Sequence, residues 1–552
     1  MLSFLHIYYL VMILVEVIIR YNGNIENIIE SLGGTAEILS SSFAIVQIPQ
    51  DNIEKLEDYT EIEYIELPKN LFFMLEQGKR SSCITIDNSN IDGLTGEDVI
   101  VGIIDSGIDY QNRMFKNSDG TTRIDSIYEV GGEIFYSNDI NSGNINHIDR
   151  YGHGTQVASI AVGNNGIAYK SDIIVVKIGQ NEFFASTTDI MRGISYIINR
   201  AVQLGKPVVI NISYGTNDGS HDGNSLFEEY INEMAVSYKV SIVVASGNEG
   251  NKGHHFRGFL ENNNTLDMDF NVASDISAMY LSIWSSFSDE FEVEIFSPLG
   301  DKGGPMRKEN VTYRYRLGDT TASIVFRNST PYNSDNEIYI RLEGATRFVD
   351  SGIWKIRFYG QNIINGQIDA WLPVNEAVGG DTAFIIPNTD TTLTIPSTSE
   401  RVITVGAYDS VNISTVGFSG RGYTRATEYI KPDLVAPGVN ILTTTVGGSI
   451  TSFTGTSVAA PFVAGSVALL MEWGIVDRND IFLYGERLKA FLCNGAIRDN
   501  SREYPNREWG YGTIDVNRIF NSIRGEYYDG RRGLNENEYE IGNLFIREPN
   551  KV

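Results

Sequence analysis

Short, continuous apolar runs recur through the middle of the chain. Runs of this kind are typical of parallel strands that are buried on both faces of a sheet. Segments with helical periodicity, such as 187–203 and 226–238, lie between several of them. This alternation predicts an α/β domain built on a parallel sheet. The apolar runs are 99–104, 173–177, 207–212, 240–245 and 402–405.

Residues 15–67 show a different order of elements. Short apolar segments alternate there with two helical patterns, which predicts the split arrangement β-α-β-β-α-β. In the second helical pattern, Asp51 and Glu54 have the spacing of a capping box, which predicts a helix over 51–59. We therefore expect a small α+β unit ahead of the parallel sheet.

An uninterrupted apolar run at 7–15 precedes this unit. It is shorter than the ~17–25 residues that span a bilayer, and no Lys or Arg stands before it. Two interpretations are open: an extension of the following strand, which we favour, and a secretion signal, which lacks a small-residue cleavage site. No other stretch approaches the length of a membrane span, so we expect none.

Between 256 and 394 the alternation of strands and helices stops. Short period-two segments, among them 278–284, 291–296 and 354–358, are separated by Gly, Asn, Asp and Ser. This pattern is typical of an all-β sandwich or jelly roll. The parallel-sheet pattern resumes afterwards, so the β-rich stretch is an insertion.

Composition and charge narrow the classes of partner. The chain has 552 residues, with 70 acidic and 43 basic side chains and a formal net charge of −27. We expect no nucleic-acid partner, because phosphate binding needs clustered Lys and Arg. Only two cysteines are present, Cys83 and Cys493, which excludes a disulfide framework and a cysteine-rich metal site.

Four glycine-containing segments place reactive side chains at the ends of predicted elements. Asp105 ends a buried strand and is followed by Ser-Gly, and His153 stands between two glycines where a helix begins. Ser457 follows Gly-Thr at the start of an apolar helix, and Asn248 lies in a glycine turn after another buried strand. In open α/β sheets, active sites gather at the carboxyl ends of the strands.

These residue types suit acyl transfer by a serine nucleophile. A serine hydroxyl needs a base to take its proton, and an imidazole such as that of His153 can do this near neutral pH. A buried carboxylate such as Asp105 holds the imidazole in one tautomer, and a side-chain amide such as Asn248 can donate to the oxyanion. Taken singly, the segments have plainer explanations as turns and a helix cap, so the evidence lies in their combination and order.

The order Asp105, His153, Ser457 is that of the subtilisin triad, and the four segments resemble those of the subtilisin-like serine proteases. The resemblance covers about 96–250 and 398–520. It implies that Asn248 is the oxyanion asparagine and that Ser213, Tyr214 and Gly215 form the segment that pairs with extended substrate.

Further features resemble the Csp germination proteases of clostridial spores: the short α+β unit, the acidic and cysteine-poor chain, and the β-rich insertion. This resemblance implies a propeptide that is cut off by the enzyme itself and can stay bound as an inhibitor. It also implies a spore location and, as substrate, the zymogen of a spore cortex-lytic hydrolase. We predict propeptide cleavage between Gln77 and Gly78, in extended, glycine-containing sequence.

The expected division of the chain follows from these patterns and resemblances. It comprises an amino-terminal extension and ferredoxin-like propeptide (1–77), a split subtilisin-like catalytic domain (78–255 and 395–524), an inserted β-sandwich of the jelly-roll kind (256–394) and a polar tail (525–552).

Alternatives are open for several features. The insert is either a rigid clamp on the catalytic domain or a docking surface for a partner. As an alternative to a protease, the protein could act as a signal-responsive regulator or scaffold whose triad is blocked by the bound propeptide. A metalloprotease is disfavoured, because His147, Asp149 and His153 do not form a His-Glu-x-x-His motif. We expect a monomer that requires no cofactor, and a structural calcium ion is undecided.

Overall fold

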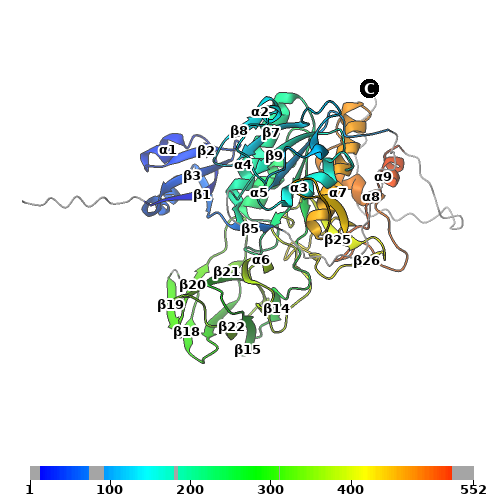
Figure 1. Ribbon diagram of the computed structural model, residues 1–552. Helices are drawn as coiled ribbons and strands as arrows, with labels where there is room; N and C mark the ends of the chain where they lie inside the picture. Colours follow the sequence, from blue (N-terminus) through cyan, green and yellow to red (C-terminus); the bar gives the residue numbers. More distant parts are fainter. Residues whose placement is uncertain (1–12, 74–92, 180–183, 310, 525–552) are drawn as a thin grey trace, which may run out of the picture.

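The apolar runs form the strands of a nine-stranded sheet in the computed structural model, which describes residues 13–73, 93–179, 184–309 and 311–524 (Figure 1). Its strands are β6 (Ile100–Asp105), β7 (Ile124–Glu129), β8 (Ile134–Tyr136), β9 (Asp172–Lys177), β11 (Val208–Ile212), β13 (Val240–Ala245), β25 (Ile403–Asp409), β26 (Ser414–Thr415) and β27 (Leu434–Pro437). The strand order is β26-β25-β13-β11-β6-β9-β7-β8, with β27 also paired to β25. Only the pairs of β25 with β26 and of β7 with β8 are antiparallel among the pairs of this sheet.

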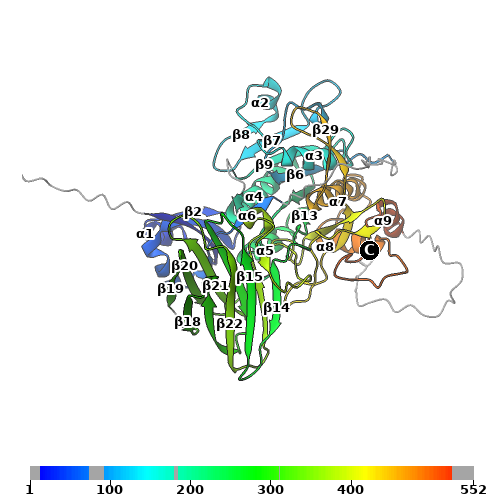
Figure 2. The same cartoon turned by 60° about the horizontal axis from the view of Figure 1, so that its bottom comes forward.

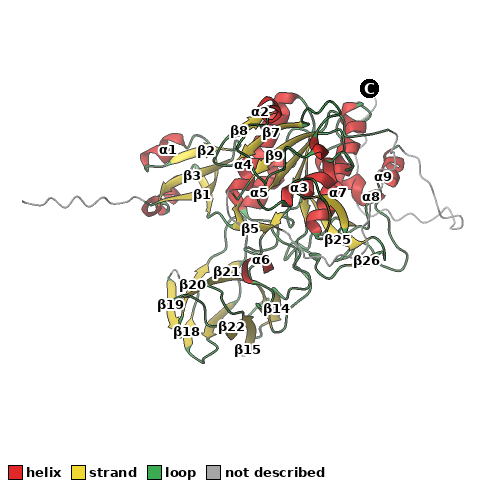
Figure 3. Ribbon diagram, viewed as in Figure 1, coloured by secondary structure: helices red, strands yellow, loops and turns green. Residues whose placement is uncertain are grey.

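Helices cover both faces of this sheet (Figure 3). Alternate residues of β6 explain why: Val101 and Ile103 join the apolar core on one face, and Ile100 and Ile104 join the core on the other. The helices that pack on the first face are α3 (His153–Val162), α7 (Thr456–Met471), α8 (Gly485–Gly495) and α9 (Val516–Ile523), and those on the second are α4 (Thr187–Leu204) and α5 (Leu226–Met234). The predicted α/β domain, a parallel sheet flanked by helices, is thus confirmed.

One helical stretch is long and apolar enough to cross a membrane among the residues that the structure describes. It runs over Thr456–Val476, and 89% of its apolar window is buried inside the protein. The stretch therefore serves as the central helix of the core.

The amino-terminal unit is a four-stranded antiparallel sheet with the order β2-β3-β1-β4. One helix, α1 (Glu26–Ser31), packs on it. Its strands are β1 (Leu14–Tyr21), β2 (Thr35–Ile38), β3 (Phe43–Pro49) and β4 (Ile62–Glu66).

The prediction of an α-helix over 51–59 in this unit is wrong. The segment forms two short 3₁₀ turns, Gln50–Asn52 and Glu54–Asp58, and Asp51 lies inside the first of them rather than capping a helix. Ile53, Leu56 and Tyr59 face the apolar core of the unit. Their spacing of three residues suits a 3₁₀ turn, which has three residues per turn, better than an α-helix.

The amino-terminal unit lies against α4 and α5. Alternation along β3 directs Ala44 and Val46 into its own core, and Phe43 and Ile45 into the core shared with these two helices. The ring of Phe43 packs edge-on against Tyr230, with centroids 5.5 Å apart. Both faces of this small sheet are therefore covered.

The inserted β-rich segment folds into two antiparallel sheets around one apolar core (Figure 2). Their strands are β14 (His255–Phe259), β15 (Thr265–Val272), β16 (Ala278–Ser285), β17 (Glu290–Phe296), β18 (Lys302–Met306), β19 (Thr312–Leu317), β20 (Thr320–Arg327), β21 (Asn336–Gly344), β22 (Gly352–Asn362), β23 (Gln367–Trp371) and β24 (Ala383–Phe384). The six-stranded sheet has the order β14-β23-β16-β21-β20-β19, and the five-stranded sheet has the order β18-β17-β22-β15-β24.

Four short elements lie outside the layers of the catalytic sheet, the amino-terminal unit and the insert. They are α2 (Ser137–Ser142), α6 (Asn375–Val378), β28 (Ile441–Thr444) and β29 (Ile450–Phe453).

Candidate active site

Asp105 and His153 form a buried pair at the carboxyl end of the central sheet. Asp105 is the last residue of β6 and His153 the first of α3, and His153 Nδ1 lies 2.7 Å from Asp105 Oδ1. Because the carboxylate can only accept, Nδ1 carries the proton and donates it. The other ring nitrogen, Nε2, is then a proton acceptor, and it is buried without a hydrogen-bond partner among the described residues.

Close packing of two glycine turns holds this pair together. A Cβ on Gly154 would lie 2.1 Å from the carbonyl oxygen of Gly107, so only glycine fits beside Asp105. The backbone N–H of Gly154 donates to Ser106 Oγ (3.0 Å), and that hydroxyl donates to Asp149 (2.7 Å). The glycines noted in the sequence therefore allow the strand and the helix to touch.

Ser457 lies at the second position of α7. The residue before the helix, Gly455, has φ 148°, a conformation that favours glycine, and Ser457 itself is fully buried. Just upstream, the Phe453 ring packs edge-on against His153, with centroids 5.5 Å apart. The start of the serine helix is thus brought to the imidazole.

Asn248 is oriented by the residue before the serine. Its Oδ1 accepts hydrogen bonds from the backbone N–H (3.1 Å) and the hydroxyl (3.0 Å) of Thr456. Since the oxygen is engaged, the amide nitrogen is the free donor, and Nδ2 is buried with no partner in the described part of the chain. A buried donor without a partner is costly, which indicates a group kept for a ligand.

A segment just after the amino-terminal unit pairs with part of Ser213, Tyr214 and Gly215, the segment predicted to bind extended substrate. β5 (Asn70–Phe73) pairs antiparallel on one side with β12 (Tyr214–Gly215) and on the other with β10 (Phe184–Ser186). The sequence missed β5, because its partners are more than 100 positions away along the chain. The predicted cleavage site, Gln77 and Gly78, lies outside the described residues.

Glu249, the residue after Asn248, connects the loop of Asn248 to the insert. This connection was not predicted from the sequence. Glu249 accepts hydrogen bonds from Asn217 Nδ2 (3.3 Å) and from the backbone N–H of Asn375 (3.2 Å), and it pairs with His254. The second ring nitrogen of His254 contacts the Thr382 carbonyl oxygen at 2.8 Å. Nothing in the local sequence marks these contacts, since they join distant segments.

His147 and Asp149 take part in structural contacts rather than in a metal site. His147 Nδ1 lies 2.8 Å from Glu129, and His147 Nε2 accepts from the backbone N–H of Ile108. Asp149 accepts from Ser106 and Thr155. Within the described ranges, no group of three His, Cys, Asp or Glu side chains is arranged to hold a metal ion.

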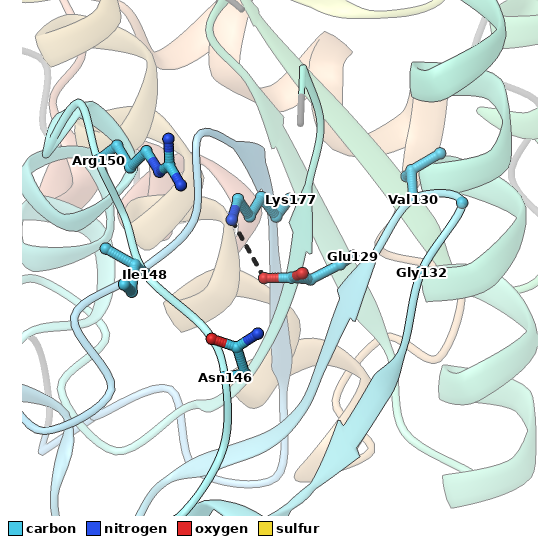
Figure 4. Close-up of a pocket in the computed structure, with 8 residues that line it drawn as sticks. Glu129, Val130, Gly132, Asn146, Ile148, Arg150 and Lys177 are labelled. Atoms are coloured by element: carbon cyan, nitrogen blue, oxygen red, sulfur yellow. Dashed lines mark hydrogen bonds and ion pairs between the residues drawn. The ribbon is translucent and has the colours of Figure 1, made fainter. Parts of the chain in front are cut away.

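A cavity of about 360 Å³ lies beside the same strand ends (Figure 4). Lys177 pairs there with Glu129 at 3.1 Å, and the exposed Arg150 forms part of the wall of this cavity.

Cys493, on α8, is only half-buried, but desolvation raises the pKa of its thiol to about 12. The thiol is therefore protonated at neutral pH. Because the thiolate is the nucleophilic form of cysteine, Cys493 is not suited to act as a nucleophile.

Comparison with known proteins assigns the class of protein. The profile of the subtilase family (Peptidase S8) matches residues 96–285 and 372–512, and the chain belongs to this family. The amino-terminal unit matches a second profile, the Csp protease B prodomain, over residues 12–69. The predicted family and its prodomain are thus confirmed.

Individual relatives agree with this assignment. The solved structure of the CspB protease of Clostridium perfringens is 38% identical, with a TM-score of 0.75, and the similarity covers 80% of this chain and 96% of that one. The minor extracellular protease Vpr of Bacillus subtilis is 23% identical over 79% of this chain and 52% of its own length. The PII-type proteinase of Lactococcus lactis is 23% identical over 90% of this chain. The chain spans about half of the length of Vpr and 29% of that of the lactococcal proteinase.

Proposed function

We propose that the protein is a serine endopeptidase whose first substrate is its own chain. One observation carries this proposal: His153 Nε2, a proton acceptor, and Asn248 Nδ2, a proton donor, are both buried without partners in the described structure, next to the helix of Ser457. These are the two groups that acyl transfer by a serine requires.

We propose the following roles for the residues of the site. Ser457 Oγ attacks the carbonyl carbon of the scissile bond while His153 Nε2 takes its proton, and Asp105 stabilises the imidazolium. Asn248 Nδ2 donates to the oxyanion, and N–H groups at the start of α7 add to the positive potential. His153 then protonates the leaving amine, and a water molecule hydrolyses the acyl-enzyme by the same steps in reverse order.

We infer that the bond between Gln77 and Gly78 is cut first and that the amino-terminal unit stays bound as an inhibitor. Its large apolar contact with α4 and α5 and the pairing of β5 support retention. Amino-terminal sequencing of the fragments of the purified protein identifies the bond.

For the second substrate we propose the zymogen of a spore cortex-lytic hydrolase, cut once in a bacterial spore. The support is the Csp-type prodomain and the similarity to the C. perfringens CspB protease. Incubation of the processed protein with such a zymogen is expected to give one new fragment and hydrolase activity. No cleavage beyond that seen with Ser457→Ala would refute this substrate.

The position of β5 also favours a second candidate function, a regulator whose triad is held blocked. A fluorophosphonate probe separates the two. Labelling of Ser457 in the processed protein supports the protease, with the His153→Ala protein as the unlabelled control. Failure of the processed wild type to react supports the regulator.

A further inference from the structure

The turn that follows Asp105 is held by side chains from the segment that precedes α3. The backbone N–H of Ser106 donates to Asp105 Oδ1 (2.8 Å), so the turn and the carboxylate are directly coupled. The Ser106 hydroxyl donates to Asp149, and the backbone N–H of Ile108 donates to His147 Nε2 (3.2 Å). The position of Asp105 therefore depends on two acceptors, a carboxylate and an imidazole.

The ring of His147 also fills the space beside Gly107. Its side chain is 0% exposed, and a Cβ on Gly107 would lie 3.1 Å from two ring atoms, Cε1 and Nε2. The carbonyl oxygen of the same glycine is the atom that Gly154 of α3 approaches. The imidazole therefore supports the turn at the point where the turn meets the helix of His153.

His147 is neutral in this arrangement. Its Nδ1 lies 2.8 Å from Glu129 Oε1, and because a carboxylate can only accept, Nδ1 carries the proton. Nε2 accepts from Ile108, so it carries none. Burial opposes the ionisation of Glu129, but the hydrogen bonds from His147 and Lys177 hold the pKa of its carboxyl below the ordinary value. The carboxylate is therefore present throughout the pH range in which an imidazole changes its charge, about 5–8.

A second proton on His147 breaks its contact with the turn. The added proton sits on Nε2 and faces the N–H of Ile108, and two donors cannot form a hydrogen bond with each other. Glu129 stabilises the imidazolium at Nδ1 but does not restore the lost bond. The other charged or titratable groups around the ring and the turn are Lys177, Tyr110, Asp105, Asp109, Asp149 and Arg150. Since a buried donor without a partner is costly, the turn moves away from the ring.

We propose that His147 is a positioning residue for Asp105: as a neutral imidazole it holds the turn in place, and as an imidazolium it releases the turn. This inference rests on the proposed endopeptidase function and adds an acid-sensitive control to it. Acid then acts on the protease at two histidines, at His153 as the base and at His147 through the turn.

The pH dependence of the reaction of Ser457 with a fluorophosphonate tests the proposal. The measured quantity is the labelling rate of the wild type divided by that of His147→Gln, whose amide oxygen can accept from Ile108 but whose side chain does not titrate. Protonation of His153 slows both proteins equally and cancels in the ratio. The ratio is expected to fall about 10-fold or more between pH 8 and pH 5, because only the wild type loses the buried bond. A ratio that stays constant would overturn the proposal.

Two further variants guard against a general fault in one protein. His147→Leu removes the acceptor at every pH and is expected to react about 10- to 100-fold more slowly than His147→Gln at pH 8. Glu129→Gln leaves the bond to Ile108 intact but removes the anion that stabilises the imidazolium. Its rate relative to His147→Gln is therefore expected to fall at a lower pH than that of the wild type. A fall at the same pH would assign the acid effect to another group and refute the role of His147.

His255 provides the matched control, as a buried histidine of the insert. Its ring nitrogens face the Asp390 carbonyl oxygen (2.6 Å) and Asp369 (3.0 Å), so both donate and neither accepts. The labelling rate of His255→Gln relative to the wild type is expected to be independent of pH between 5 and 8. The same pH dependence in this variant as in His147→Gln would contradict a specific role of His147.

Hydrogen exchange at the Ile108 amide separates this inference from the proposed function, because it needs no activity. Protection, corrected for the intrinsic pH dependence of exchange, is expected to fall about 10-fold or more from pH 8 to pH 5 in the wild type and to stay constant in His147→Gln. A protein that shows this change but does not react with fluorophosphonate refutes the protease and retains the role of His147 in the turn. A reactive protein with constant protection and a constant rate ratio refutes that role and leaves the protease intact.

Discussion

Hydrogen bonds from Thr456 fix the orientation of the Asn248 side chain. Thr456 provides two donors to the amide oxygen, so the buried amide nitrogen is the group of Asn248 that is left to donate. The close approach of Gly107 and Gly154 is equally restrictive, because a single Cβ at 154 would meet the backbone of the turn after Asp105. The proposed chemistry therefore depends on atoms whose positions leave little freedom.

Replacement of Asn248 by alanine tests the oxyanion role. Asn248→Ala is expected to lower kcat about 10²–10³-fold with little change in KM, because the donor acts on the transition state. The exposed Asn199 on α4 provides a control, and Asn199→Ala is expected to keep wild-type kinetics. A proportional rise in KM at constant kcat would instead indicate a role in substrate binding.

Glu228 predicts a dependence of stability on pH. Burial raises the pKa of its carboxyl to about 7, although hydrogen bonds from Thr398 and Ser225 act in the opposite direction. The folded protein therefore holds a proton that the unfolded chain releases above about pH 4.5, so the free energy of unfolding falls as pH rises from about 4.5 to 7. The effect is about 3 kcal/mol over this range.

Glu228→Gln mimics the protonated carboxyl and is expected to remove this slope. Urea unfolding at pH 5 and pH 7.5 measures it: the loss of stability between the two pH values is expected to be smaller in Glu228→Gln than in the wild type. Equal losses in both proteins would mean that the carboxyl titrates normally.

At the scale of elements, the outcome of sequence-based prediction depended on how far apart the interacting residues lie. Continuous apolar runs predicted the parallel strands, and short motifs predicted the segments of Asp105, His153, Asn248 and Ser457, because these signals are local. β5 was missed because its strand character comes from partners beyond residue 180. The hydrogen bond of Thr456 to Asn248 joins residues 208 positions apart, which no local pattern reveals.

The contact of β1 and β2 with α4 leads to a prediction about prodomain retention. Arg192 on α4 bonds to Glu16 on β1 (2.6 Å) and to Glu37 on β2 (2.7 Å). Arg192→Ala is expected to weaken the binding of the processed prodomain about 10-fold, because two charge-assisted bonds are lost. Arg200→Ala is the matched control, since Arg200 on the same helix pairs with Asp125 inside the catalytic domain.

Gel filtration of the processed variants at low concentration measures this retention. Earlier release of the prodomain from Arg192→Ala, with faster peptide cleavage, is the expected result. Equal release from both arginine variants would mean that the prodomain is bound mainly by the apolar contact or by the pairing of β5.

At the scale of the whole molecule, the insert, the amino-terminal unit and the active-site loop are connected to one another. Tyr332 of the insert packs against Tyr64 of the amino-terminal unit, with ring centroids 5.4 Å apart. Trp371, also in the insert, stacks between His221 (4.1 Å) and His255 (4.6 Å). These contacts, of which those of Trp371 are buried, favour the clamp over the docking surface as the role of the insert.

The pair of Glu249 and His254 tests the clamp. His254→Ala leaves the buried Glu249 carboxylate without its imidazole partner, and the loss of this buried hydrogen bond is expected to cost about 1–3 kcal/mol of stability. Because Glu249 follows Asn248, kcat is expected to fall as well. A double-mutant cycle with Glu249→Ala measures the coupling, and additive effects of the two changes would contradict it.

The account rests on Ser457 as a nucleophile that cuts its own chain, and the most direct measurement is the intact mass of two purified proteins. Wild type is expected to give two fragments, with the new amino terminus following the prodomain. Ser457→Ala, purified in the same way, is expected to give one uncut chain with an unchanged circular dichroism spectrum. A Ser457→Ala protein that is still cut when pure would contradict the account.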